Sequence, residues 1–196
     1  MPPPGRRRSP TRGVFAIEDP ALLLPDPIAL DTSFVVEALI ATQPLHPTCA
    51  TFLARIVETG VSVVTSDLLR IELVEAAFSI ALKERWGGQW RSHRTDGRVR
   101  RRGGRLLRDA VARYEKLLTS VDHLPVPVGR ATDMAATMMI DYGLASYDSV
   151  HTASAIMAGA KAIVTTDTGF ALVPAPTLTI YTDRSRLATC RSKRQR

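Results

Sequence analysis

The chain alternates short apolar runs with longer segments in which apolar residues recur every three or four positions. Short runs rich in β-branched residues and bounded by turn residues predict strands that are buried on both faces. Recurrence at three and four positions predicts helices with one buried face. The expected strands are 28–30, 61–65, 162–166 and 178–182, with a further extended piece at 123–129.

Helices are predicted between these strands. The clearest amphipathic segment spans 106–118, where Leu106, Ala110, Tyr114 and Leu117 lie on one face. Strands alternating with helices predict an α/β fold, a three-layer sandwich in which helices flank a mostly parallel central sheet. The other expected helices are 34–41, 46–60, 66–86, 130–143 and 146–159.

Composition divides the chain into a folded body and basic appendages. Residues 1–26 lack periodicity and are rich in Pro and Arg, so we expect a flexible arm. The domain is expected at 27–183, with an Arg-rich insertion at about 85–105 whose five glycines favour a loop, and a basic tail at 184–196.

The net charge of +7 is distributed unevenly. Residues 1–13 hold four Arg and no acid, 85–105 hold eight Arg and one Asp, and 184–196 hold six Arg or Lys and no acid. The rest of the chain is therefore acidic. Basic appendages are either solvated tails or attract a polyanion such as a nucleic acid.

The bulk composition excludes several classes of protein. With 45% hydrophobic and 23% charged residues, wholesale disorder is not expected. Cys49 and Cys190 lie far apart without metal-ligand spacing or a disulfide framework, which fits a reducing cytoplasm. Acidic residues and prolines interrupt the apolar stretch after residue 13, so no signal-peptide core forms. No apolar run approaches the ~20 residues of a membrane span.

Two aspartates directly follow predicted strands. Asp31 follows strand 28–30 and Asp167 follows strand 162–166, so both are expected at the carboxyl edge of a parallel sheet, where ligands collect. Asp148 lies in the first turn of a predicted helix that Ser146 can cap, and the helix dipole alone can account for it. Asp31 can likewise simply begin the helix that follows it.

Glu72 is harder to explain by local structure. Its helix is apolar on nearly every face, so Glu72 is expected to be largely buried, and a buried carboxylate requires a cationic partner. Arg70 and Lys83 are candidates, and so is a bound Mg²⁺, which prefers oxygen ligands. His151 is expected to be a packed or hydrogen-bonded histidine more often than a metal ligand.

Hydroxyl side chains accompany the strand-end acids. Ser33 and Thr165 lie at the same predicted strand ends as Asp31 and Asp167, where hydroxyls can orient carboxylates or metal-bound waters. Hydroxyls at such positions also serve as ordinary helix caps.

The chain resembles PIN domains, and specifically the VapC-type toxins of bacterial type II toxin–antitoxin systems. The resemblance covers roughly 28–182 and rests on LDTS at 30–33, IELVEA at 71–76 and YGLASYDSVHTASAIMAGAKAIVTTDTGF at 142–170. It implies a parallel sheet between helices and cleavage of RNA that depends on Mg²⁺ or Mn²⁺. The residues that it places at the family's four acidic positions are Asp31, Glu72, Asp148 and Asp167.

The resemblance also implies partners: an RNA substrate, a small antitoxin protein that blocks the site, and a second copy in a homodimer. Many relatives carry Asn where this chain has Ser33. We assign RNA binding to the basic insertion, with Trp86 and Trp90 available for base stacking. The residues that we expect to contact RNA phosphates are Arg100, Arg101 and Arg102.

The sequence also allows three other functions. They are a stand-alone RNA-processing nuclease, an RNA-binding module without activity, and a phosphatase with an Asp nucleophile. The phosphatase architecture usually has a second Asp two residues after the first, where this chain has Ser33.

Overall fold

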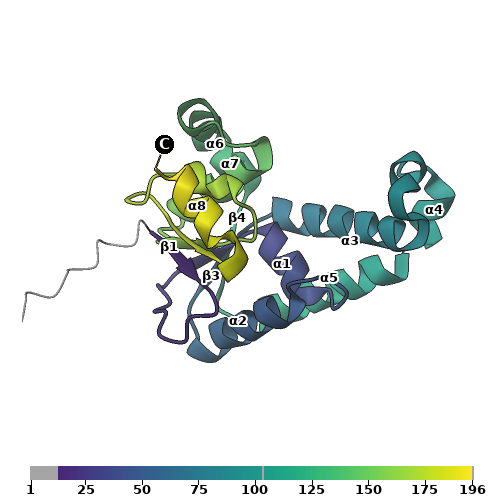
Figure 1. Ribbon diagram of the computed structural model, residues 1–196, viewed down its shortest axis with the longest axis horizontal. Coiled ribbons are helices and arrows are strands. Elements are labelled where there is room, and N and C mark those ends of the chain that lie inside the picture. Colours follow the sequence, from purple (N-terminus) through teal and green to yellow (C-terminus); the bar gives the residue numbers. More distant parts are fainter. Residues whose placement is uncertain (1–12, 103, 196) are drawn as a thin grey trace, which may run out of the picture.

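A single parallel sheet organises the chain (Figure 1). The computed structural model describes residues 13–102 and 104–195, without the side chains of Arg100 and Arg102. In this part of the chain six strands pair in the order β1-β6-β5-β2-β3-β4, all parallel. The strands are β1 Val14–Ala16, β2 Ile28–Leu30, β3 Val63–Ser66, β4 His123–Val126, β5 Ala162–Val164 and β6 Thr179–Thr182.

Helices cover both faces of the sheet, which confirms the predicted three-layer α/β sandwich. Alternation along β2 sends Ile28 and Leu30 into one core and Ala29 into the other. The first core also takes side chains from α1 Thr32–Leu39, α2 His46–Thr59, α3 Leu68–Trp86 and α5 Gly104–Thr119. The second takes them from α6 Val128–Tyr142, α7 Ser146–Met157 and α8 Leu187–Lys193.

The strand order places a topological switch point at β2. The chain proceeds from β2 to β3 and β4 on one side, and then returns to β5 on the other side of β2. Connections leave a switch point in opposite directions, which opens a crevice at the carboxyl ends of the two central strands. Asp31 follows β2 and Thr165 follows β5, so both lie at this crevice.

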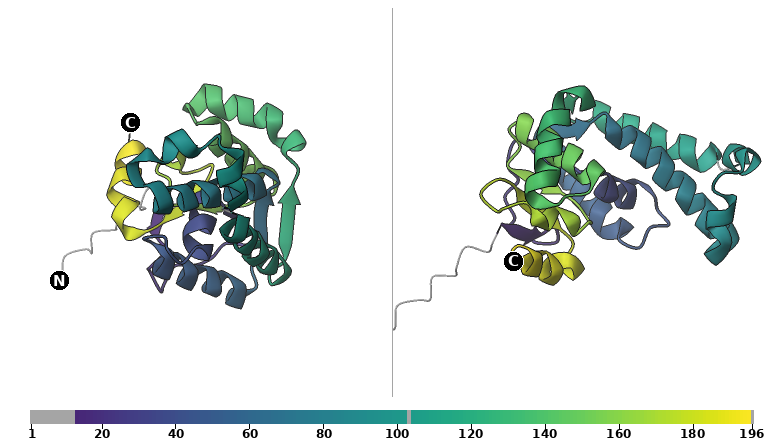
Figure 2. Two further views of the ribbon diagram at one scale, coloured as in Figure 1. Left: turned by 90° about the vertical axis from the view of Figure 1, so that its right-hand side faces the viewer. Right: turned by 90° about the horizontal axis from the view of Figure 1, so that it is seen from above.

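A long helical hairpin projects from the sheet. The helices α3 and α5 run side by side away from it and are joined by the 3₁₀ helix η1 Gly87–His93 and by α4 Gly97–Arg102 (Figures 1 and 2). The prediction of a loop at 85–105 was therefore wrong: the segment is largely helical. None of the described helices, α3 included, is both long and apolar enough to cross a membrane.

Both ends of the described chain belong to the fold, contrary to the predicted arm and tail. Residues 14–16 pair with β6, and Ile17 and Leu22 are buried in the core. The predicted arm is therefore corrected for residues 14–26, while residues 1–12 lie outside the described residues. Helix α8 buries Cys190, and Arg194 donates a hydrogen bond to the carbonyl of Gly13 at 2.9 Å. Burial of apolar atoms thus includes segments whose composition suggested solvated appendages.

Two substitutions in the corrected segment test this assignment. Ile17→Ala removes a side chain that is 4% exposed and is expected to cost at least about 2 kcal/mol, lowering Tm by at least about 4 °C. Leu23→Ala, at a side chain that is 85% exposed, is the matched control and is expected to stay within about 0.5 kcal/mol. Thermal unfolding measures the Tm of both variants. If neither substitution lowers the Tm, residues 14–26 are a flexible arm and not part of the core.

Candidate functional site

Six carboxylates line one cleft at the carboxyl edge of the sheet: the four acids predicted from the sequence, together with Glu37 and Glu75. Asp31 follows β2, Asp167 follows β5, Glu72 projects from α3 and Asp148 from α7. The cleft has a volume of about 720 Å³ and lies at the switch point. The structure therefore brings together all four acids predicted from the sequence, although they come from four separate elements.

Asp31 is the most deeply buried of the four acids. Its Oδ2 accepts hydrogen bonds from the Ser33 backbone N–H at 3.1 Å, the Ser33 hydroxyl at 2.5 Å and the Thr165 hydroxyl at 2.8 Å. Burial raises the pKa of Asp31 above its ordinary value, and these hydrogen bonds together with His151 offset only part of that effect. Asp31 is also the N-cap of α1, so one carboxylate fixes both the helix start and the site.

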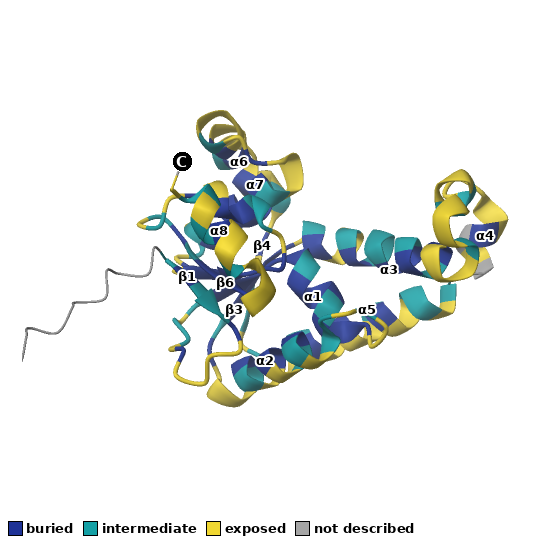
Figure 3. Cartoon of the chain, in the orientation of Figure 1, coloured by how far each residue is buried: buried dark blue, intermediate teal, exposed yellow. Residues whose placement is uncertain are grey.

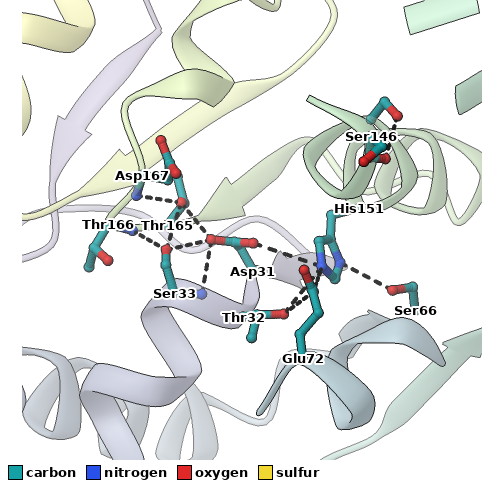
Figure 4. A network of polar contacts seen from close by, with 11 residues as sticks. Asp31, Thr32, Ser33, Ser66, Glu72, Ser146, His151, Thr165, Thr166 and Asp167 are labelled. Atoms are coloured by element: carbon teal, nitrogen blue, oxygen red, sulfur yellow. Dashed lines mark hydrogen bonds and ion pairs between the residues drawn. The ribbon is translucent and has the colours of Figure 1, made fainter. Parts of the chain in front are cut away.

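Hydroxyl groups tie the loop after β5 to the start of α1. The Ser33 hydroxyl accepts from the Thr166 N–H at 3.0 Å, and the Thr165 hydroxyl accepts from the Asp167 N–H at 2.9 Å. Ser33 and Thr165 also lie 3.1 Å apart, oxygen to oxygen. In Figure 4, Asp31 lies between this group and the pair formed by Glu72 and His151. These bonds fix the position of the loop that carries Asp167.

Asp148 and Asp167 converge on Gly169. A Cβ atom at residue 169 would lie 2.8 Å from Asp148 Oδ2 and 3.2 Å from Asp167 Oδ1, so the two carboxylates can approach this backbone only because it is glycine. Burial and then the charges of Asp167 and Asp31 raise the pKa of Asp148 to about 7. Burial and the neighbouring carboxylates therefore outweigh the attraction of His151 for the ionised form of Asp148.

The predicted cap of the helix that carries Asp148 is wrong. Helix α7 has Ala145 at its N-cap and no side-chain capping bond, so Ser146 is not the cap that the sequence suggested. Ser146 instead accepts a hydrogen bond from the Ser149 hydroxyl at its carbonyl, at 2.6 Å. Asp148 does lie in the first turn of α7, where the helix dipole favours an anion, but burial and neighbouring carboxylates oppose this by raising its pKa to about 7.

Glu72 is paired with a histidine rather than with the expected lysine or arginine. Its Oε2 lies 2.5 Å from His151 Nε2 and accepts from the Thr32 hydroxyl at 2.6 Å. The expected partners are engaged elsewhere: Arg70 pairs with Glu115 at 2.7 Å, and Lys83 lies 5.2 Å from the centre of the Trp90 ring.

His151 is a buried, hydrogen-bonded residue, as expected from the sequence, but its role as the partner of Glu72 was missed. His151 lies one helical turn after Asp148, a spacing that places both side chains on one face of α7. This spacing could have revealed that His151 faces the acidic residues of the site. Its Nδ1 lies 3.1 Å from the Ser66 hydroxyl, and Nε2 lies 4.0 Å from Asp31 Oδ1. Burial alone would lower the pKa of His151, but the bond to Glu72 and the neighbouring carboxylates raise it.

The donor chemistry of the cleft suits a hard divalent cation. Carboxylate oxygens are the ligands that Mg²⁺ prefers, and Mg²⁺ commonly binds through one or two carboxylates while keeping several waters. In the described part of the chain, no group of three or more His, Cys, Asp or Glu side chains is arranged as a ready-made metal cage. Asp148 and Asp167, which meet at Gly169, are residues that could hold such an ion.

The family assignment agrees with this geometry. The family model of the PIN domain matches residues 28–176, most of the chain. The chain belongs to the PIN domain family. Among curated proteins no match is found. PIN domains are generally metal-dependent nucleases, and the match includes the four predicted acids in the cleft of this PIN domain. The family supports hydrolysis of phosphodiester bonds, and it is consistent with a divalent metal.

The raised pKa of Asp148 predicts how stability depends on pH when chelator keeps metal away. Between its ordinary pKa of 3.8 and about 7, the unfolded state ionises while the folded state retains the proton, so the folded state loses stability as pH rises across this interval, up to its own pKa of about 7. The Asp148→Asn variant does not suffer this loss. Because Asp148 is only partly buried, solvent screens the effect to about 1 kcal/mol, and we expect the Tm of the variant to exceed that of wild type by about 2–4 °C at pH 8 and by less at pH 5. Equal differences at the two pH values would contradict the raised pKa.

Proposed function

We propose that this PIN domain is a Mg²⁺-dependent endoribonuclease, with Mn²⁺ as a possible substitute ion. The observation that carries the proposal is the convergence of Asp148 and Asp167 on Gly169, beside Asp31 and Glu72, with the pKa of Asp148 raised to about 7. Such a cluster is electrostatically unfavourable unless a cation binds there. Choice of RNA as substrate draws on the resemblance to VapC-type toxins and on the basic helical hairpin.

The residues of the cleft have separate roles in the proposed reaction. Asp31, Asp148 and Asp167 would hold the metal, directly or through water. When bound, the ion neutralises phosphodiester charge and lowers the pKa of a water. Glu72 orients the attacking water, and Thr32 and His151 fix its carboxylate by hydrogen bonds at 2.6 and 2.5 Å. Ser33 and Thr165 hold Asp31 in place.

The rival functions fit the geometry less well. A phosphatase needs an accessible Asp nucleophile, whereas Asp31 is only 4% exposed and its Oδ2 accepts three hydrogen bonds. An RNA-binding module without activity has no need for four carboxylates around one cleft, since they repel the phosphate backbone. The second candidate, a stand-alone RNA-processing nuclease, uses the same site and differs only in its cellular role.

Substitution of single cleft acids tests the nuclease proposal. Asp31→Asn and Asp148→Asn are each expected to lower Mg²⁺-dependent cleavage of a total RNA sample by at least about 100-fold, because even residues behind the metal ligands cost up to this much. Asp133→Asn, which removes an exposed acid from α6, is the matched control and should cleave like wild type. Cleavage that survives both cleft substitutions, or persists in chelator, would refute the site.

We also propose that the protein acts in the cytoplasm as the toxin of a toxin–antitoxin pair. This role rests on the resemblance, which further implies a homodimer and a small antitoxin that blocks the cleft. The simplest block is a basic side chain placed among the four acids, where it would supply the charge that the metal otherwise provides.

Expression in a bacterial host tests the toxin role separately from the chemistry. Wild type and Asp133→Asn are expected to arrest growth, while Asp148→Asn is not, because arrest requires RNA cleavage. Colony counts after induction, with protein levels matched by immunoblot, measure the effect. Active enzyme without growth arrest would favour the stand-alone nuclease.

A further inference from the structure

The end of the helical hairpin is a compact basic surface. We call residues 83–102 the hairpin tip. It combines the end of α3 with η1 and α4 (Figure 1). Its described acids are Glu84 and Asp96, both exposed. They are outnumbered by exposed cations, which are Lys83, Arg85, Arg91, Arg94, Arg98 and Arg101.

The hairpin tip has a small core of its own. Phe78, Leu82 and Val99 are buried together, and Trp86 and Trp90 pack against them. Figure 3 shows this part of the chain exposed on the outside around a few buried residues. The cations are therefore carried by an ordered support, which differs from the mobile loop expected from the sequence.

The two tryptophans hold cations in place. The Arg85 guanidinium lies 4.7 Å from the centre of the Trp86 ring, whose other neighbour is the stacked ring of His93 at 4.7 Å. Lys83 and Arg91 each lie 5.2 Å from the centre of Trp90. Cation–π contacts orient these side chains before any ligand arrives, so less rotamer entropy is lost on binding. Trp86 and Trp90 thus orient cations, a role that the sequence did not predict.

The tip is connected to the acidic cleft. Arg94 lines the cleft and donates two hydrogen bonds to Glu75 Oε1, at 3.0 and 2.6 Å. Glu72 and Trp86 are on the same helix, and a rise of 1.5 Å per residue separates them by about 21 Å along its axis. One strand of a duplex rises by about 3.4 Å per nucleotide, so a nucleic acid strand that spans these 21 Å has about six nucleotides.

We propose that the hairpin tip binds the phosphate backbone of the RNA that is cut in the cleft, so that the substrate is an RNA long enough to contact both. This inference rests on the proposed nuclease function. Charge complementarity favours a polyanion. An RNA fits better than an acidic protein, because protein interfaces need apolar anchors and the exposed large hydrophobic residues of the described chain all lie elsewhere.

A triple substitution removes the oriented cations: Lys83→Gln, Arg85→Gln and Arg91→Gln. The matched control removes three exposed cations outside the cleft and the tip: Arg130→Gln, Lys161→Gln and Arg184→Gln. Both are made in full-length Asp148→Asn protein, so that RNA stays intact while fluorescence anisotropy reports binding of a labelled RNA of about 20 nucleotides, longer than typical sites. Thermal unfolding verifies that each variant is folded.

We expect the tip variant to bind about 10- to 100-fold more weakly at about 0.1 M salt, and its slope of log K against log salt to become shallower by about 2, because each lost phosphate contact removes about 0.7. The control should change affinity far less. A charge-keeping variant, Arg85→Lys with Arg91→Lys, should retain most of the slope. An equal loss of RNA affinity in the two triple variants would mean that net charge alone drives binding. An unchanged RNA affinity of the tip variant would mean that the tip binds a different partner. Either result overturns the proposal.

Cleavage by chains with an intact Asp148 separates this inference from the proposed function. The tip substitutions should slow cleavage of a long RNA but leave cleavage of a trinucleotide unchanged, because a short substrate in the cleft cannot reach Lys83, Arg85 and Arg91. Equal slowing of both substrates would contradict the inference while leaving the nuclease standing. Tip-dependent binding by a wild-type protein that cleaves no RNA would instead reject the nuclease function and keep the tip as a binding surface.

Discussion

Repulsion among carboxylates is the constraint around which this PIN domain is built. Two unit charges about 4 Å apart repel by about 4 kcal/mol at an effective dielectric constant of 20, and six acids line the cleft. The fold tolerates this because the acids are attached to the ends of strands and helices whose buried faces are fixed by two hydrophobic cores. Packing of the cores therefore supplies the free energy that keeps an unfavourable charge cluster assembled.

Hydrogen bonds inside the cleft distribute this cost unequally. Asp31 and Glu72 are held by hydroxyl groups and by His151, whereas Asp148 faces other carboxylates and its pKa rises to about 7. The carboxylates of Asp31 and Glu72 thus have a fixed geometry, whereas burial and neighbouring carboxylates disfavour the ionised form of Asp148.

The helical hairpin places opposite charge at a distance from the cleft. An acidic cleft alone repels a nucleic acid, and a basic surface alone has no chemistry. Helix α3 contributes to both, since Glu72 is near its start and the cations of the tip are near its end. A rigid helix fixes the separation between the two surfaces, which is the property that would make substrate length matter.

The sequence by itself determined the α/β class and the parallel sheet, and it placed Asp31 and Asp167 at strand ends, because strand-end placement and hydrophobic period are local properties of the chain. The addition of Glu72 and Asp148 to these two acids rested on the resemblance to PIN domains. Neither periodicity nor composition foretold that His151 pairs with Glu72, that Gly169 accommodates two carboxylates, or that Trp86 and Trp90 hold cations. Basic composition also concealed the burial of β1 and α8. Those features depend on contacts between residues that are distant in sequence, and only the packing of the tertiary structure decides which of them meet.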